Sequence, residues 1–137
     1  MKPLLYFVCT GNSARSQMAE GFARQMLGDR FEIASGGLEP SSLHPLAVRA
    51  MAEAGVDISR QYSKPIDVDR LRTAHMAVTL CGDAEERCPV TPPAVRRLHW
   101  GLPDPAKAQG GEEERLKIFR QVRDEIEARL HDLAESL

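Results

Sequence analysis

Hydrophobic and polar positions along the chain form blocks that are typical of strands followed by helices. The unbroken apolar run Leu4–Val8 is typical of a strand buried on both faces, as in a parallel sheet. Three further strands are predicted, at Phe31–Ala34 before Ser35-Gly36-Gly37, at His75–Leu80 and at Val95–Trp100. Because strands alternate with helices, we expect an α/β protein with a parallel sheet of four strands and helices on both faces.

Apolar residues at helical spacing predict the helices between these strands. The first helix is expected from Ser16 to a cap at Gly28, and the second from His44-Pro45 to Gly55. A short third helix is expected at Asp67–Arg72. In the last helix, three glutamates (112–114) precede apolar residues at three- and four-residue steps, namely Leu116, Phe119, Val122, Ile126, Leu130 and Leu133.

The overall composition is that of an ordinary globular protein. A chain of 137 residues can bury one core, so a single domain over residues 1–137 is expected. The net charge of −2 argues against a nucleic-acid or membrane-surface protein, since both usually carry a basic excess. No stretch has the length of a membrane span and no signal peptide is recognisable, so a cytoplasmic protein is expected. Disulfides seldom persist in that compartment, and the three cysteines are therefore candidates for catalysis, redox chemistry, metal binding or core packing.

The most informative stretch is Cys-Thr-Gly-Asn-Ser-Ala-Arg at residues 9 to 15, between the first predicted strand and the first predicted helix. The five residues between Cys9 and Arg15 are small and include no proline, so their backbone N–H groups can surround an anion. Arg15 adds a planar fork of donors that suits a tetrahedral oxyanion, and a positive helix end favours the nucleophilic thiolate of Cys9. The residues expected to bind the anion are Thr10, Gly11, Asn12, Ser13, Ala14, Arg15 and Ser16. The alternative is a buried structural cysteine followed by a surface arginine.

Three candidate residues follow predicted strands. Cys9, Cys81 and Asp104 each lie at or just after a predicted strand's carboxyl end. Ligand crevices in open α/β sheets lie outside these ends. If the strands are parallel, the three side chains are therefore expected at one edge of the sheet.

The stretch CTGNSARSQMAE, Cys9 to Glu20, resembles the anion loop of the low-molecular-weight protein tyrosine phosphatase fold and of the thioredoxin-coupled arsenate reductases built on it. In that superfamily the cysteine is the nucleophile, the arginine binds the oxyanion and an Asp-Pro supplies the general acid, which Asp104-Pro105 matches. The segments VTLCGDAEERCPVTPP and RRLHWGLPDPA resemble the arsenate reductases. The likeness covers nearly the whole chain and implies a three-layer, low-molecular-weight phosphatase-like fold.

The resemblance implies that arsenate is reduced to arsenite by a relay of three thiols, without a cofactor. Cys9 attacks arsenate while Asp104 protonates the departing oxygen. Cys81 then attacks the Cys9 sulfur, which expels arsenite and leaves a Cys9–Cys81 disulfide. Cys88 attacks Cys81, the disulfide moves to Cys81–Cys88, and thioredoxin as electron donor reduces it. Phosphate and sulfate would bind as analogues of arsenate, and a monomer is expected.

The spacing of Cys81 and Cys88 adds a prediction about motion. Seven helical steps would separate them by about 10.5 Å, whereas a disulfide needs Cα atoms closer than about 7 Å. A mobile segment at about residues 82 to 93 is therefore predicted, and it would expose Cys88 in the oxidised protein.

Two other functions use the same pocket. A phosphatase would need only Cys9, Arg15 and Asp104, and an oxyanion or redox sensor would bind without turnover. Cys81 and Cys88 could instead be core residues, while six intervening residues are more than a usual zinc site has.

The sequence departs from the family pattern at two positions. Ala14 stands where many members carry a second loop cysteine. Some arsenate reductases bind potassium beside the loop, and Asn12, Glu20 and Ser35 match positions used there, but Lys64 stands where an acidic ligand is expected. Its ammonium group would replace the ion, so no metal is assigned.

Overall fold

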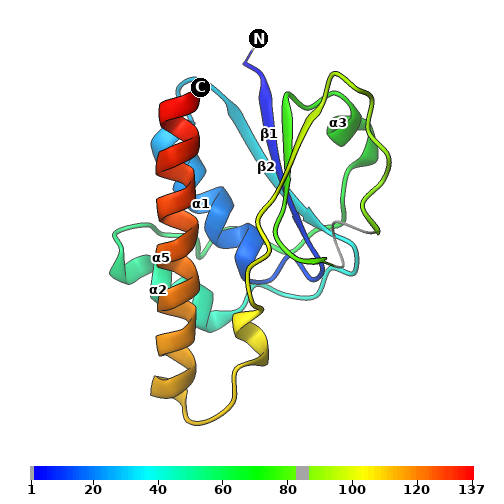
Figure 1. Ribbon diagram of the computed structural model, residues 1–137. Coiled ribbons are helices and arrows are strands. Elements are labelled where there is room, and N and C mark those ends of the chain that lie inside the picture. The colour runs from blue at the N-terminus through cyan, green and yellow to red at the C-terminus, as the bar shows by residue number, and fades with distance from the viewer. Residues whose placement is uncertain (1, 83–86) are drawn as a thin grey trace.

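The computed structural model describes residues 2–82 and 87–137 (Figure 1). Its strands form one parallel sheet in the order β2-β1-β3-β4, with bounds β1 Leu4–Cys9, β2 Glu32–Gly37, β3 Met76–Thr79 and β4 Arg96–His99. All six residues of β1 and all four of β3 are buried, as expected for the two central strands of a parallel sheet.

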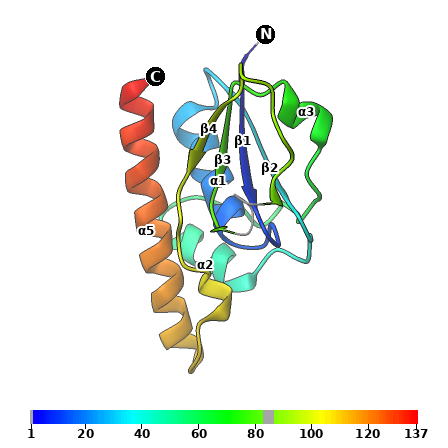
Figure 2. The same ribbon diagram turned by 45° about the vertical axis from the view of Figure 1, so that its right-hand side comes forward.

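Helices cover both faces of the sheet. On one face, α5 (Glu112–Ser136) packs against α1 (Arg15–Leu27) and α2 (Pro45–Glu53), and its six predicted apolar residues are buried. The short helix α3 (Val68–Arg72) lies on the other face (Figure 2). The predicted three-layer α/β fold is therefore confirmed. No helix within residues 2–82 and 87–137 has both the length and the apolar character of a membrane span.

The second strand is longer than predicted. We expected it to end before Ser35-Gly36-Gly37, because two glycines usually mark a turn, but β2 continues to Gly37. Gly36 is needed for close packing rather than for a turn, since a Cβ there would lie 2.9 Å from Ile66 Cα and 3.0 Å from the Tyr6 hydroxyl. The other elements agree with their predicted ranges to within one or two residues at nearly every end.

The strand order reverses next to β1, because β2 lies on one side of it and β3 on the other. Such a reversal opens a crevice at the carboxyl ends of the strands. Cys9 ends β1, and Cys81 follows the end of β3 by two residues. The fold therefore places both thiols at the position where α/β sheets bind ligands.

Candidate active site

The segment from Cys9 to Arg15, here called the anion loop, joins β1 to α1. Asn12 has a φ of 48°, the left-handed conformation that asparagine tolerates better than most residues. This residue reverses the chain direction within the loop, and Arg15 then begins α1. The loop therefore ends at a helix N-terminus, where backbone N–H groups have no partner within the helix.

The backbone carbonyls of residues 9 to 14 all accept hydrogen bonds from groups outside the loop. The donors, in order along the loop, are Leu38 N, Glu39 N, Ser41 N together with Ser63 Oγ, Gln17 Nε2, His44 N and Met18 N, at 2.8–3.2 Å. In a trans peptide the N–H points opposite to the carbonyl of the same unit. The N–H groups of residues 10 to 15 are therefore turned away from these donors, as an anion-binding nest requires.

Gly37 lies directly against the anion loop. A Cβ at this position would lie 2.7 Å from Thr10 O and 2.8 Å from Asn12 N, both of them backbone atoms. Backbone atoms of a loop held by six carbonyl contacts cannot move aside as a flexible side chain does. Only glycine therefore fits between β2 and the loop.

Replacing Gly37 with alanine is expected to lower the free energy of unfolding by about 1–3 kcal/mol, because the added methyl group displaces the loop. Phosphate binding should weaken about tenfold, since the N–H groups of the displaced loop no longer point toward a single position. Urea unfolding and phosphate titration measure the two effects. Gly111→Ala is the matched control, since a Cβ there meets no atom within 4 Å and the change at this N-cap costs less than about 1 kcal/mol. Equal phosphate affinity in Gly37→Ala and wild type would contradict the role given to Gly37.

Cys9 is buried and contacts the hydroxyl group of Ser16. Its Sγ lies 2.8 Å from Ser16 Oγ, and Asn12 Nδ2 donates to the same Oγ at 2.7 Å. The Ser16 hydroxyl therefore bridges Asn12 of the anion loop and the sulfur of Cys9.

The guanidinium of Arg15 is held at the mouth of the anion loop. It is 6% exposed, and Nη1 donates to Leu102 O at 3.0 Å while Nη2 lies 3.5 Å from Asp104 Oδ2. Asp104 is fixed in turn, because its Oδ1 accepts from Ala106 N at 3.0 Å, the cap of the 3₁₀ helix Pro105–Lys107. The structure thus brings Arg15 and Asp104 together, as the sequence predicts.

Cys81 lies next to the anion loop, and Cys88 is buried as well. Cys81 Sγ lies 3.0 Å from Thr10 Oγ1, and both thiols are 7% exposed. Burial raises the pKa of Tyr6, and Cys88 is among the smaller causes that act in the same direction. All three cysteines are reduced. The predicted mobile segment at 82 to 93 falls partly on residues 83–86, outside the described residues, and stays a prediction.

His44 connects the anion loop to α2. Its backbone N–H donates to Ser13 O at 2.9 Å, and its Nδ1 accepts from Leu46 N as the N-cap of α2. Burial lowers the pKa of His44, Arg115 acts in the same direction, and Asp104 opposes both. A lowered pKa keeps the ring neutral at neutral pH, which preserves the acceptor that the cap needs.

A polar cluster of the buried Asn12, Glu20 and Ser35 and the partly exposed Lys64 lies beneath the anion loop. The ammonium group of Lys64 lies 3.0 Å from Ser35 Oγ, 3.3 Å from Glu20 Oε1 and 3.5 Å from Asn12 Oδ1. Three oxygen-bearing side chains therefore surround a cation that the protein itself supplies. Within residues 2–82 and 87–137, no three His, Cys, Asp or Glu side chains are grouped as a metal site would need. The assignment of no metal stays a prediction.

Replacing Lys64 with aspartate is expected to make stability depend on potassium. Two carboxylates beside the Asn12 and Ser35 oxygens would form a negative oxygen-rich site, which attracts a hard cation. The unfolding midpoint of this variant should rise in potassium chloride compared with choline chloride at equal ionic strength, whereas that of wild type should not. Lys117→Asp, on the exposed face of α5, is the control. Equal midpoints in both salts for Lys64→Asp would contradict the prediction.

Sequence reasoning missed the groups that shape the loop from outside. Gln17 is fully buried and donates to Asn12 O and Oδ1 and to Tyr62 O. The backbone N–H groups of residues 38–44 that donate to the loop carbonyls lie in the connection between β2 and α2, which has no hydrophobic periodicity. The run Ser35-Gly36-Gly37 was the available signal, because small residues at a strand end permit close approach of another backbone segment.

Comparisons with known proteins agree with this geometry. Residues 4–137 match the family model described as low molecular weight phosphotyrosine protein phosphatase. An arsenate reductase of Bacillus subtilis is 57% identical over 133 residues, which are 97% of this chain and 96% of that protein.

Solved structures show the same similarity. One is described as an arsenate reductase in the phosphate binding state. It has a TM-score of 0.78 at 37% identity, and the match covers 99% of this chain and 98% of that chain. A thioredoxin-dependent arsenate reductase of Corynebacterium glutamicum has a TM-score of 0.79 at 29% identity, covering 98% of this chain and 61% of that longer one. The chain therefore belongs to the low molecular weight phosphotyrosine protein phosphatase family, in the branch that contains these arsenate reductases.

Proposed function

We propose that this protein reduces arsenate to arsenite and that thioredoxin returns it to the reduced state. The observation that carries the proposal is the position of Cys81, whose sulfur lies 3.0 Å from a side chain of the anion loop that begins at Cys9. Hydrolysis of a phosphate ester needs one thiol, whereas a two-electron reduction needs a second thiol within reach of the first. The names of the relatives described above support the same function.

The first step takes place within the anion loop. Arsenate binds to the N–H groups of residues 10 to 15 and to the guanidinium of Arg15, which balances its charge. The Cys9 thiolate attacks arsenic, and Asp104 donates a proton to the oxygen that departs as water. Asp104 is suited to this role because its carboxyl group lies 3.5 Å from the guanidinium that would hold the anion.

The later steps move electrons from sulfur to arsenic. Cys81 attacks the Cys9 sulfur, the sulfur–arsenic bond breaks, and arsenite leaves with the electron pair. Cys88 then displaces Cys9 from Cys81, and thioredoxin reduces the resulting Cys81–Cys88 disulfide. Cys88 is buried in the reduced protein, so the segment that carries it has to move before thioredoxin can reach the Cys81–Cys88 disulfide. We also propose that the protein acts as a single-domain monomer in the cytoplasm.

A phosphatase activity is the second candidate, because Cys9, Arg15 and Asp104 form a complete set for phosphoryl transfer without Cys81. NADPH consumption with thioredoxin and its reductase, measured with and without arsenate, separates it from reduction. Hydrolysis of an aryl phosphate is measured in parallel. Arsenate-dependent NADPH consumption supports the reductase. Aryl phosphate hydrolysis without it would indicate a phosphatase, and the absence of both activities would indicate an oxyanion sensor.

A further inference from the structure

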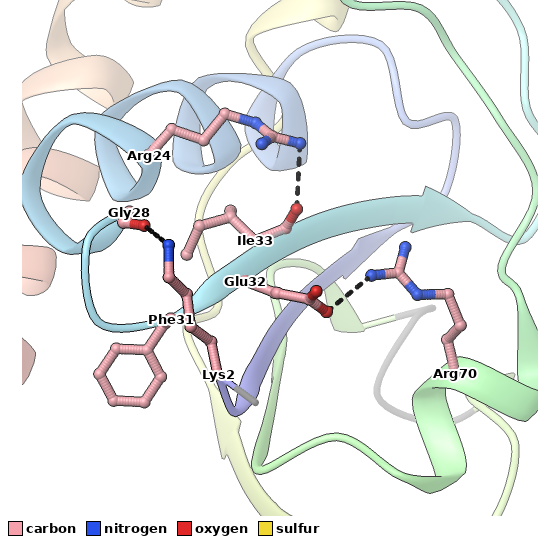
Figure 3. Close-up of a pocket in the computed structure, with 7 residues that line it drawn as sticks. All are labelled: Lys2, Arg24, Gly28, Phe31, Glu32, Ile33 and Arg70. Carbon is pink, nitrogen blue, oxygen red and sulfur yellow. Dashed lines mark hydrogen bonds and ion pairs between the residues drawn. The ribbon is translucent and has the colours of Figure 1, made fainter.

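A cavity of about 540 Å³ lies at the other end of the sheet from the anion loop (Figure 3). It is lined by Glu32 and Ile33 at the start of β2 and by Lys2, just before β1. Arg24 of α1 and Arg70 of α3 complete its charged lining. The proposed reaction uses none of these side chains.

The cavity is positively charged although the protein carries a net charge of −2. Three cationic side chains and one carboxylate line it, and the cations come from three separate parts of the chain. Exposed like charges repel one another, and the carboxylates of Glu20 and Glu32, which pair with Arg24 and Arg70, offset this repulsion only in part. This arrangement therefore indicates an anion-binding site more strongly than three basic residues scattered over a surface would.

Two of the cations are fixed by backbone carbonyls. Lys2 Nζ donates to Gly28 O at 2.8 Å, and Arg24 Nη2 donates to Ile33 O at 3.0 Å. A lysine has three N–H donors and an arginine five, so these bonds position each cation and leave further donors for a ligand. Figure 3 shows the Lys2 side chain reaching to Gly28 and the Arg24 guanidinium directed at Ile33.

Glu32 is the group that a bound anion would replace. Its carboxylate lies 3.5 Å from Arg70 Nη2, and the two side chains are 59% and 48% exposed. An ion pair that is this long and this exposed adds little to stability. The Glu32 side chain can therefore turn into solvent and leave Arg70 to the ligand.

We propose that this cavity is a second anion-binding site, which takes a small molecule with two or more linked phosphoryl groups. The anion loop surrounds one tetrahedral oxyanion with N–H groups from consecutive residues. Here the cations are spread around a cavity of about 540 Å³, which suits negative charge distributed over several phosphoryl groups. The proposal is independent of arsenate reduction, so either can fail without the other.

Arg24 would also connect this site to the polar cluster beneath the anion loop. Its Nε and Nη2 each lie 3.1 Å from Glu20 Oε2, while Glu20 Oε1 accepts from Ser35 and Lys64. An anion that draws the Arg24 guanidinium toward itself weakens its bonds to Glu20. Occupation of the cavity should therefore change the amide signals of Asn12 and Ser35 as well as those of the cavity.

The test is an amide NMR titration of the full chain with inorganic pyrophosphate at low ionic strength, where exposed charges are least screened. We expect signals of Gly28 and Ile33 to shift with a dissociation constant on the order of 1 mM. Inorganic phosphate should shift the signals of residues 10 to 15 and affect Gly28 and Ile33 more weakly. In Arg15→Lys the pyrophosphate shifts of Gly28 and Ile33 should persist, which separates the cavity from the anion loop.

Charge variants of the cavity give opposite expected effects. Lys2→Gln combined with Arg70→Gln should weaken pyrophosphate binding at least about fivefold, and Glu32→Gln should strengthen it about twofold. Arg129→Gln is the control, since it removes a positive charge from an ion pair on α5 that lies outside the cavity. The proposal is wrong if Gly28 and Ile33 do not shift up to about 20 mM pyrophosphate, or if the cavity variants titrate like the control.

Discussion

Serine at position 81 or 88 is expected to lower thioredoxin-coupled arsenate turnover by at least about 10³-fold, because each change removes one thiol of the relay. Hydrolysis of an aryl phosphate should stay within about twofold of wild type in both variants, since Cys9, Arg15 and Asp104 remain. NADPH consumption and aryl phosphate hydrolysis measure the two activities on the same preparations.

The two variants should differ in what they release. Cys81→Ser cannot attack the sulfur–arsenic bond, so it should form no arsenite. Cys88→Ser retains that step and should release a single equivalent of arsenite, after which it stops with a Cys9–Cys81 disulfide. Quantifying arsenite and mapping the disulfide by mass spectrometry distinguish the variants.

Cys9→Ser is the internal control for this prediction, because the loss of the nucleophile should remove both activities. Wild-type arsenate turnover in either Cys81→Ser or Cys88→Ser would exclude the order of thiols proposed above. Unfolding midpoints close to that of wild type would show that the losses are chemical rather than structural.

Lysine in place of Arg15 is expected to lower kcat/KM about 10²–10³-fold for both arsenate reduction and aryl phosphate hydrolysis. A guanidinium can donate to two oxygens of the anion in one plane, whereas an ammonium group acts as a point charge. Lysine would also lose the contact with Leu102 O that orients Arg15. Steady-state kinetics with both substrates measure the change.

Arg129→Lys is the control for this replacement, because Arg129 lies on α5 and its guanidinium pairs with the exposed carboxylate of Glu125. It should leave both activities unchanged. A decrease of less than tenfold in Arg15→Lys would show that a positive charge at this position suffices and that the planar guanidinium is not needed.

Much of the fold follows from local patterns that the sequence displays openly. Leu4–Cys9 is apolar along its whole length and becomes a central strand, and the three- and four-residue steps after Glu112 become the buried face of α5. The small residues between Cys9 and Arg15 indicated the anion loop, because small side chains leave the backbone N–H groups accessible and the helix N-terminus that follows favours an anion.

The features that sequence reasoning did not find depend on contacts between distant segments. β2 extends to Gly37 because residues 35–37 pair with Phe7–Cys9 of β1, and Gly37 also bonds to Lys64 and Ile66; no local propensity encodes these partners. The partners of the loop carbonyls come from irregular connections, where hydrophobic periodicity carries no information. The contacts that distant segments make around the site are therefore visible only in the structure.

The six carbonyl contacts behind the anion loop have a consequence for how fast and how tightly oxyanions bind. The backbone is arranged during folding, so the arriving ligand does not have to order it, and association should proceed without a slow conformational phase. Affinity then becomes linked to the integrity of the 38–44 connection. A transient local opening of that connection would release the anion even while the rest of the molecule stays folded.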